Sequence, residues 1–203
     1  MKITSITQQK KRENRYNIFI DGQFAFGIDG VDLLYYKLKE GMELSEERYS
    51  EILEQLVFVK AREKALKYLD YKQRTEKEVR KKLADEYSPE IIDRVLEMLK
   101  NYKIVDDDNY ARLYIKDCLN LKGWGKRRIL AELALKGIDR DKAEMLLENT
   151  GDIMLEKAKK LIDKRVKGKI TDMAEYKKHF DFLLRRGFDH ETAKTVLDMK
   201  KDE

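Results

Sequence analysis

Apolar positions along this 203-residue chain alternate with polar ones near the N-terminus and recur at helical spacing further along. In "RYNIFIDGQFAFGID", apolar and polar residues alternate on both sides of Asp21-Gly22, which predicts a β-hairpin. Two short helices are expected next, in "DLLYYKLKEGMEL", ended by Gly41, and in "SEERYSEILEQL", capped by Ser45. Residues 1–56 are therefore expected to form a small cap that contains the hairpin.

Beyond residue 56 the apolar residues recur at helical spacing, and the whole pattern repeats. The stretch "LALKGIDRDKAEMLL" from Leu133 matches "LLRRGFDHETAKTVL" from Leu183, 50 residues later. The stretches "VKAREKALKYL", up to Leu69, and "NYARLYIKDCL", up to Leu119, are related by the same offset. We therefore predict three tandem repeats, at residues 57–105, 106–150 and 151–203.

Each repeat is predicted to hold three helices with one apolar stripe apiece. In the second repeat the stripes are Tyr110, Tyr114 and Cys118, then Ile129 and Leu133, then Ala143, Leu146 and Leu147. Helix starts are marked by capping residues at Thr75 with Glu78, Ser88 with Pro89, and Asp172 with Glu175. Helix ends are marked by Gly137 and Gly187.

The pattern predicts a mainly α protein of tandem three-helix, helix-turn-helix-like repeats behind a small N-terminal cap. We expect an elongated array and a monomer, because each repeat packs chiefly on its neighbours.

Charged residues are distributed unevenly along the chain. The net charge is +5, with ten Lys and Arg against four Asp and Glu between residues 60 and 82, and eleven against five between 156 and 186. Residues 85–108 reverse this, with three against eight. Basic side chains thus gather on the first and second helices of the repeats, which indicates an acidic partner surface or nucleic acid, although ordinary solvated faces are the alternative. The candidate partner-binding or DNA-binding cations are Arg74, Lys77, Lys81, Lys126, Arg127, Arg128, Arg185 and Arg186.

Catalytic chemistry finds little support in the sequence. Cys118 lies on an apolar helix face and is expected to be a buried, inert thiol, and His179 and His190 are expected at the surface or at its boundary. The run "DDDN" from Asp106 lacks the glycine and terminal glutamate of a calcium loop and is interpreted as a helix start. We expect no enzyme, no catalytic residue, no metal and no cofactor. The start of the chain lacks the apolar stretch of a signal peptide, and no run reaches the length of a membrane span, so we expect a cytoplasmic protein.

Three stretches resemble a known family. "YLDYKQRTEKEVRKKL" from Tyr68, "KIVDDDNYAR" from Lys103 and "GWGKRRILAELALKGI" from Gly123 are similar to RecX, the bacterial regulator of the RecA recombinase. The resemblance covers nearly the whole chain, including "FIDGQFAFGID" near the N-terminus and, less specifically, "FLLRRGF" from Phe182. Some such relatives run longer, which leaves open a further helix after "DMKKDE".

The resemblance implies a protein that binds RecA, lies in the groove of RecA filaments on single-stranded DNA, and limits filament growth, strand exchange and ATP hydrolysis. It implies a role in DNA repair, recombination and the SOS response. Besides binding the protein partner, the chain is expected to make weak direct contacts to DNA phosphates. It is not expected to bind a membrane. Two other functions stay open on the residues alone: a free-standing helix-turn-helix DNA-binding protein, and a helical scaffold for another protein.

Overall fold

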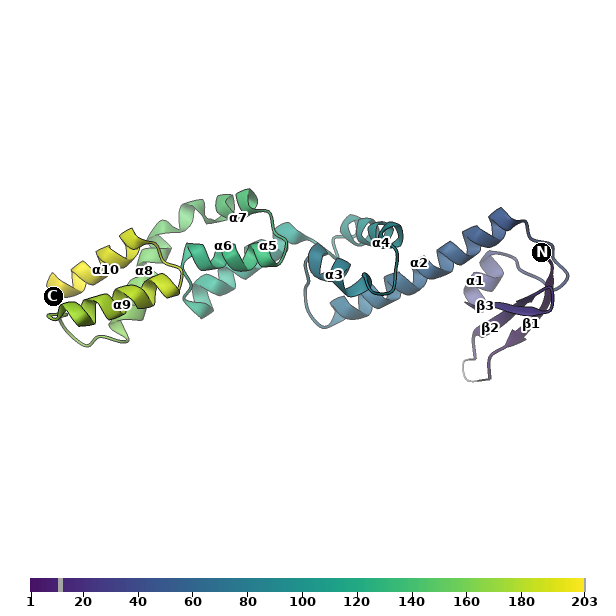
Figure 1. The fold of residues 1–203 in the computed structure, drawn as a ribbon, viewed down its shortest axis with the longest axis horizontal. Coiled ribbons are helices and arrows are strands. Elements are labelled where there is room, and N and C mark those ends of the chain that lie inside the picture. The colour runs from purple at the N-terminus through teal and green to yellow at the C-terminus, as the bar shows by residue number, and fades with distance from the viewer. Residues whose placement is uncertain (11–12, 203) are drawn as a thin grey trace. The chain divides into compact units, whose positions relative to one another are not determined.

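The structure is a computed structural model that describes residues 1–10 and 13–202 (Figure 1). Residues 11 and 12 of the expected cap and residue 203 of the expected third repeat lie outside the described residues. Two compact units make up the chain: Met1–Tyr68 with Leu83–Val95, and Leu69–Lys82 with Leu96–Glu203.

A three-stranded antiparallel sheet forms the N-terminal part of the first unit. Its strands are β1 (Ile3–Gln8), β2 (Arg15–Ile20) and β3 (Gln23–Asp29), in the order β1-β2-β3. The predicted hairpin is confirmed: Asp21 and Gly22 join β2 to β3 at φ values of 49° and 81°, the left-handed pair that suits the twist of the two strands. β1 was not predicted from the sequence. One face of the sheet is covered, and its core consists of Ile3, Ile18, Ile20, Phe26, Ile28, Leu38, Leu44, Ile52 and Leu56.

The two helices that follow the sheet correct the prediction. The first, α1 (Gly30–Tyr35), ends before Gly41, because Lys37 takes a left-handed φ of 53° and the Leu38 N–H donates to the Leu33 carbonyl to close the last turn. The second, α2 (Glu46–Asp70), is one helix of 25 residues. The predicted helix end near residue 56 is wrong, since no glycine or proline interrupts this segment, and the expected boundary between cap and first repeat falls inside α2.

The remaining elements follow the three-helix pattern (Figure 1). After α2 come α3 (Glu76–Leu83) and α4 (Pro89–Asn101). The second repeat holds α5 (Asp107–Asp117), a π-helical turn η1 (Cys118–Lys122), α6 (Lys126–Leu135) and α7 (Arg140–Leu147). The third holds a 3-10 turn η2 (Glu148–Thr150), α8 (Gly151–Asp163), α9 (Met173–Arg185) and α10 (His190–Asp202). The mainly α fold with tandem three-helix repeats is confirmed.

The 50-residue period is also visible in burial. Leu83, Leu133 and Leu183 occupy equivalent positions on α3, α6 and α9, and each is 0% exposed. Gly137 and Gly187 both take a left-handed φ, 88° and 89°, just past α6 and α9, as predicted.

The second and third repeats share a single hydrophobic core. It includes Ile129, Leu133 and Leu147 from the second repeat together with Ala158, Ile162 and Leu183 from the third. Short helices are marginal by themselves, so this common core is what stabilises both repeats. The two repeats are one packed body, not two separate ones.

Candidate functional site

The second helices of successive repeats meet head to tail in the second unit. The N-terminus of α3 lies at the C-terminus of α6, and the N-terminus of α6 lies at the C-terminus of α9. We call these contacts the first and second junctions. Most of the predicted cations lie on the helix turns that form them.

At the first junction, a capping box also binds the neighbouring repeat. The Thr75 N–H donates to Glu78 (3.1 Å), and the Glu78 N–H donates to the Thr75 hydroxyl oxygen (3.3 Å), as the sequence predicts. The same hydroxyl donates to the backbone carbonyl of Lys136 (2.7 Å), and the Lys136 ammonium pairs with Glu78 (3.1 Å). Thr75 is completely buried. Burial opposes the charged form of Glu78, but the hydrogen bonds from the Thr75 backbone and from Lys136 outweigh it, so the pKa of this carboxyl lies below its usual value.

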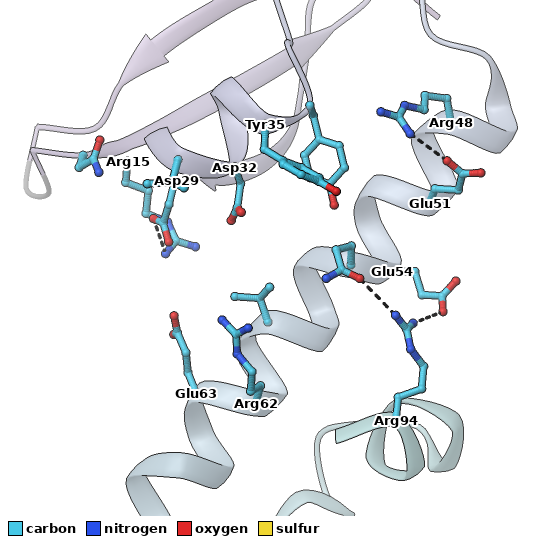
Figure 2. Close-up of a pocket in the computed structure, with 15 residues that line it drawn as sticks. Arg15, Asp29, Asp32, Tyr35, Arg48, Glu51, Glu54, Arg62, Glu63 and Arg94 are labelled. Atoms are coloured by element: carbon cyan, nitrogen blue, oxygen red, sulfur yellow. Dashed lines mark hydrogen bonds and ion pairs between the residues drawn. The ribbon is translucent and has the colours of Figure 1, made fainter. Parts of the chain in front are cut away.

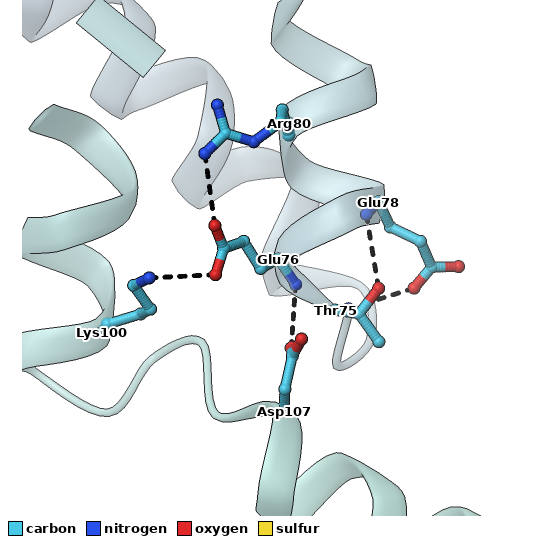
Figure 3. A network of polar contacts seen from close by, with 6 residues as sticks. All are labelled: Thr75, Glu76, Glu78, Arg80, Lys100 and Asp107. Carbon is cyan, nitrogen blue, oxygen red and sulfur yellow. Dashed lines mark hydrogen bonds and ion pairs between the residues drawn. The ribbon is translucent and has the colours of Figure 1, made fainter. Parts of the chain in front are cut away.

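Figure 3 shows the acidic side of this junction. The Glu76 carboxylate pairs with Lys100 (2.9 Å) and with Arg80 (3.2 Å), while the Glu76 N–H donates to Asp107 (2.9 Å). Burial and the nearby Glu76 charge raise the pKa of Asp107 against that hydrogen bond. The first turn of α3 is therefore held by Lys100 of the first repeat and by Asp107 of the second repeat.

At the second junction, backbone atoms take the place of the capping side chain. The Gly125 N–H donates to the Arg186 carbonyl (2.9 Å), and the Arg127 N–H donates to the Gly187 carbonyl (3.0 Å). These bonds satisfy two of the N–H groups that a helix start leaves unpaired. A side chain on Gly125 is excluded, since a Cβ there would lie 2.2 Å from the Phe188 nitrogen.

Both junctions require the glycine that ends the preceding helix. A Cβ on Gly137 would lie 2.7 Å from the Lys77 Cβ, and a Cβ on Gly187 would lie 2.4 Å from the Arg128 Cβ. The two glycines thus serve the close approach of two backbones as well as the helix stop.

The structure distributes the predicted cations unevenly. Exposed positions are held by Lys77, Lys81, Arg127, Arg128 and Arg185, whereas Arg74, Lys126 and Arg186 are half-buried. The Arg186 guanidinium donates to the carbonyl of Lys122 (2.8 Å) and lies over the Phe182 ring (5.1 Å). Arg186 therefore contacts the second junction, and the cations Arg127, Arg128 and Arg185 beside it are exposed.

Aromatic rings lie beside these cations, which was not predicted from the sequence. Trp124 lies under the guanidinium of Arg128 (4.1 Å) and the ammonium of Lys122 (4.4 Å), and Lys122 also lies over Tyr114 (4.6 Å). The four-residue spacing of Tyr110 and Tyr114, which share a face of α5, was the available signal for the tyrosines. Trp124 precedes α6, so helical spacing gave no signal for its contact with Arg128.

The two histidines, Cys118 and Asp106 occupy different environments, and one of them corrects the prediction. His179 was expected at the surface or its boundary, but it is buried, and burial lowers its pKa. His190 is exposed. Cys118 is buried as predicted, and burial raises the pKa of its thiol. Asp106 caps α5 by accepting from the Asn109 N–H (2.8 Å), which confirms "DDDN" as a helix start.

In the first unit, an open groove of about 1320 Å³ runs beside α1, α2 and α4 (Figure 2). Its charges are largely paired with one another: Arg48 with Glu51 (3.1 Å), Arg94 with Glu54 (2.5 Å) and Arg15 with Asp29 (3.5 Å). The groove therefore offers little net charge to a partner, unlike the junctions.

Within residues 1–10 and 13–202, no three His, Cys, Asp or Glu side chains come together as metal ligands. No helix among the described residues combines the length and the apolar composition that crossing a bilayer requires.

Comparison with known proteins matches one family along the chain. Four family models match in order: the N-terminal domain of regulatory protein RecX (residues 1–45), and the first (61–99), second (106–147) and third (152–197) RecX three-helix domains. Regulatory protein RecX of Clostridioides difficile (strain 630) is 36% identical over 199 residues, covering 97% of this chain and 94% of the relative. That of Finegoldia magna is 34% identical over 194 residues, covering 93% and 95%.

Solved structures agree. One crystal structure of regulatory protein RecX has a TM-score of 0.74 and 31% identity, covering 100% of this chain and 99% of the other. The crystal structure of RecX from Lactobacillus salivarius has a TM-score of 0.63 and 29% identity, covering 70% of this chain and 97% of the other.

Proposed function

This chain belongs to the RecX family of regulatory proteins, and from that premise we propose that it binds the RecA recombinase and its filament on single-stranded DNA. By binding, it limits filament growth, strand exchange and ATP hydrolysis during DNA repair and recombination, including the SOS response. It acts in the cytoplasm as a monomer, without catalysis of its own and without a cofactor.

One observation carries this proposal: all four RecX domains match in their family order, from the first residue to residue 197. A fold alone does not imply a function, but a family match over the full set of domains narrows it to the family's regulatory role.

The exposed cations of the junctions support the proposal physically. Lys77 and Lys81 on α3, Arg127 and Arg128 on α6, and Arg185 on α9 present positive charge from three successive repeats. A RecA filament on DNA offers carboxylates and phosphates in a repeating arrangement. Weak contacts at each repeat then add up, because binding at one repeat raises the effective concentration at the next.

The test is a titration of RecA-catalysed ATP hydrolysis on single-stranded DNA. Wild-type protein is expected to reduce the hydrolysis rate in a dose-dependent way. The variant Lys126→Glu/Arg127→Glu/Arg128→Glu is expected to need a higher concentration for the same inhibition. Acidic residues suit the first turn of a helix, so its fold is expected to survive, which a circular dichroism melt checks.

A matched control carries the same charge change on third helices: Arg140→Glu/Lys142→Glu/Lys194→Glu, with two substitutions in the first turn of α7 and one on α10. It is expected to inhibit nearly as well as wild type. Equal inhibition by both triple variants would remove the junction cations from the proposal, and no inhibition by wild type would refute the proposal itself.

A further inference from the structure

Cations and aromatic rings alternate along one stretch of the second repeat. The Tyr110 and Tyr114 rings are stacked (6.0 Å between centroids, 14° between planes), and the Lys136 ammonium lies over both, at 5.5 and 5.9 Å. Lys122 lies between Tyr114 and Trp124, and Arg128 lies over Trp124. We call this set the cation–aromatic ladder; its members are Tyr110, Tyr114, Lys122, Trp124, Arg128 and Lys136.

The backbone that carries Trp124 is held in place from the neighbouring repeat. Gly123 takes a left-handed φ of 58°, and a Cβ there would lie 3.3 Å from the Leu161 side chain. The Arg186 guanidinium donates to the Lys122 carbonyl, and the Gly125 N–H donates to the Arg186 carbonyl (2.9 Å). The indole is thus positioned before any partner arrives, which reduces the entropy lost on binding.

Two of the ladder's cations are available to a partner. Lys122 and Arg128 are exposed, and neither pairs with a carboxylate in the part of the chain that the structure describes. Lys136 differs, because it pairs with Glu78 at the first junction. Burial raises the pKa of Tyr114 to about 12, so this ring stays uncharged at neutral pH.

We propose that the cation–aromatic ladder binds single-stranded polynucleotide, with unpaired bases stacking on Trp124 and the tyrosines and with Lys122 and Arg128 on the flanking phosphates. The exchange is local: a base replaces a cation over the ring, and the long, flexible cationic side chain moves to the phosphate. Rings that accept any base face, flanked by cations, bind without sequence preference. This inference goes beyond recombinase binding and does not rest on it.

The chemistry of the ladder favours this ligand over the neighbouring classes. An acidic protein surface would engage the cations and leave the rings unused. In a duplex the base faces are stacked on one another and are not offered to a side chain. Only an unstacked strand supplies phosphates and free base faces together.

The experiment uses the protein and a short oligothymidylate, without recombinase. Trp124 is the single tryptophan of the chain, so its emission reports directly on the ladder. Saturable quenching of the emission is expected, with an affinity that falls as salt rises. An oligouridylate of the same length, titrated in parallel, tells whether DNA or RNA is the better strand, and a duplex of that length is expected to bind without comparable quenching.

Variants separate stacking from charge. Lys122→Gln/Arg128→Gln keeps the Trp124 reporter and is expected to weaken the affinity for the oligothymidylate at least tenfold. The control Lys169→Gln/Lys194→Gln makes the same charge change at exposed positions elsewhere in the unit, and it is expected to change this affinity less than threefold. With a labelled strand, Trp124→Leu is expected to weaken binding about fivefold or more, and Trp124→Phe, which keeps a ring, less. Circular dichroism confirms that each variant is folded.

Equal affinities for duplex and single strand, with no change in Trp124 emission, would overturn the inference, as would failure of the single strand to bind. Because this titration contains no RecA, its failure leaves the ATPase result intact. Failure of the ATPase test, in turn, leaves the stacking result intact.

Discussion

Three glycines of the second unit provide a graded test of the junctions. Gly187 takes φ +89° and sits against Arg128, whereas Gly168 takes φ +98° with nothing within 4 Å of an added Cβ. Gly151 begins α8 at φ −55°, again with nothing within 4 Å. Alanine at Gly187 therefore meets both backbone strain and a steric clash, alanine at Gly168 meets backbone strain alone, and alanine at Gly151 meets neither.

The magnitudes follow from these geometries. A left-handed conformation costs a non-glycine residue about 1–2 kcal/mol. Gly187→Ala also forces its Cβ to 2.4 Å from the Arg128 Cβ and 2.5 Å from the Arg128 nitrogen. Because the nitrogen is backbone, α6 has to shift, and overpacking of this kind costs about 1–3 kcal/mol more. We expect losses in the free energy of unfolding of about 2–5 kcal/mol for Gly187→Ala and about 1–2 kcal/mol for Gly168→Ala. Gly151→Ala is expected to gain about 0.4–1 kcal/mol by restricting the unfolded chain.

The assay is urea denaturation followed by Trp124 emission, since this residue lies next to the second junction. All three substitutions leave the net charge unchanged, so differences between them report on geometry. If Gly187→Ala cost no more than Gly168→Ala, α6 and α9 would not meet as described, and the second junction would be wrong.

Three further predictions concern the core, the first junction and the shape. Leu133→Ala is expected to lower the free energy of unfolding by about 2–5 kcal/mol in a thermal or denaturant melt, since Leu133 is 0% exposed. The control Leu135→Ala, at a 73% exposed position of the same helix, is expected to change the free energy of unfolding little. Equal losses in the two variants would show that the buried face of α6 is wrong. The folded-state pKa of Glu78 lies below its ordinary value of 4.5, so its charge stabilises the fold above that pH, and this stabilisation is lost as the pH falls through the folded-state pKa. The variant Glu78→Gln is therefore expected to be less stable than wild type at neutral pH but not well below pH 4.5. A difference in stability that did not change with pH in urea melts would contradict the ion pair with Lys136. Small-angle scattering is expected to give a radius of gyration well above the roughly 17 Å of a compact sphere of this length, and a value near 17 Å would contradict the elongated array.

Local signals in the sequence predicted much of the fold. The capping box of Thr75 and Glu78 and the helix stops at Gly137 and Gly187 depend on residues close together in the chain, and all three are confirmed. The helix end predicted near residue 56 was wrong because it had no such local signal. It was inferred from the repeat period, and no helix-breaking residue lies in this segment.

Contacts between distant residues were out of reach of such signals. The hydrogen bond from Thr75 to Lys136 spans 61 residues, and its geometry follows from how two repeats pack. The burial of His179 had a local signal, since it precedes the buried Leu183 by one helical turn, but its polar side chain argued against the core. Lys126, Arg127 and Arg128 lie in the first turn of α6, as predicted, whereas the contact of Arg186 at the second junction depends on how α9 packs against the residues before α6.

Regulation of RecA is the central claim, and direct capture tests it most directly. The chain is immobilised and exposed to RecA alone, and then to RecA with single-stranded DNA and ATP. We predict that RecA is retained in both cases and more strongly as a filament, because successive repeats then engage successive subunits. The arm without DNA separates recombinase binding from any binding to the strand itself. Failure to retain RecA under either condition, by a chain that circular dichroism shows to be folded, would contradict the claim.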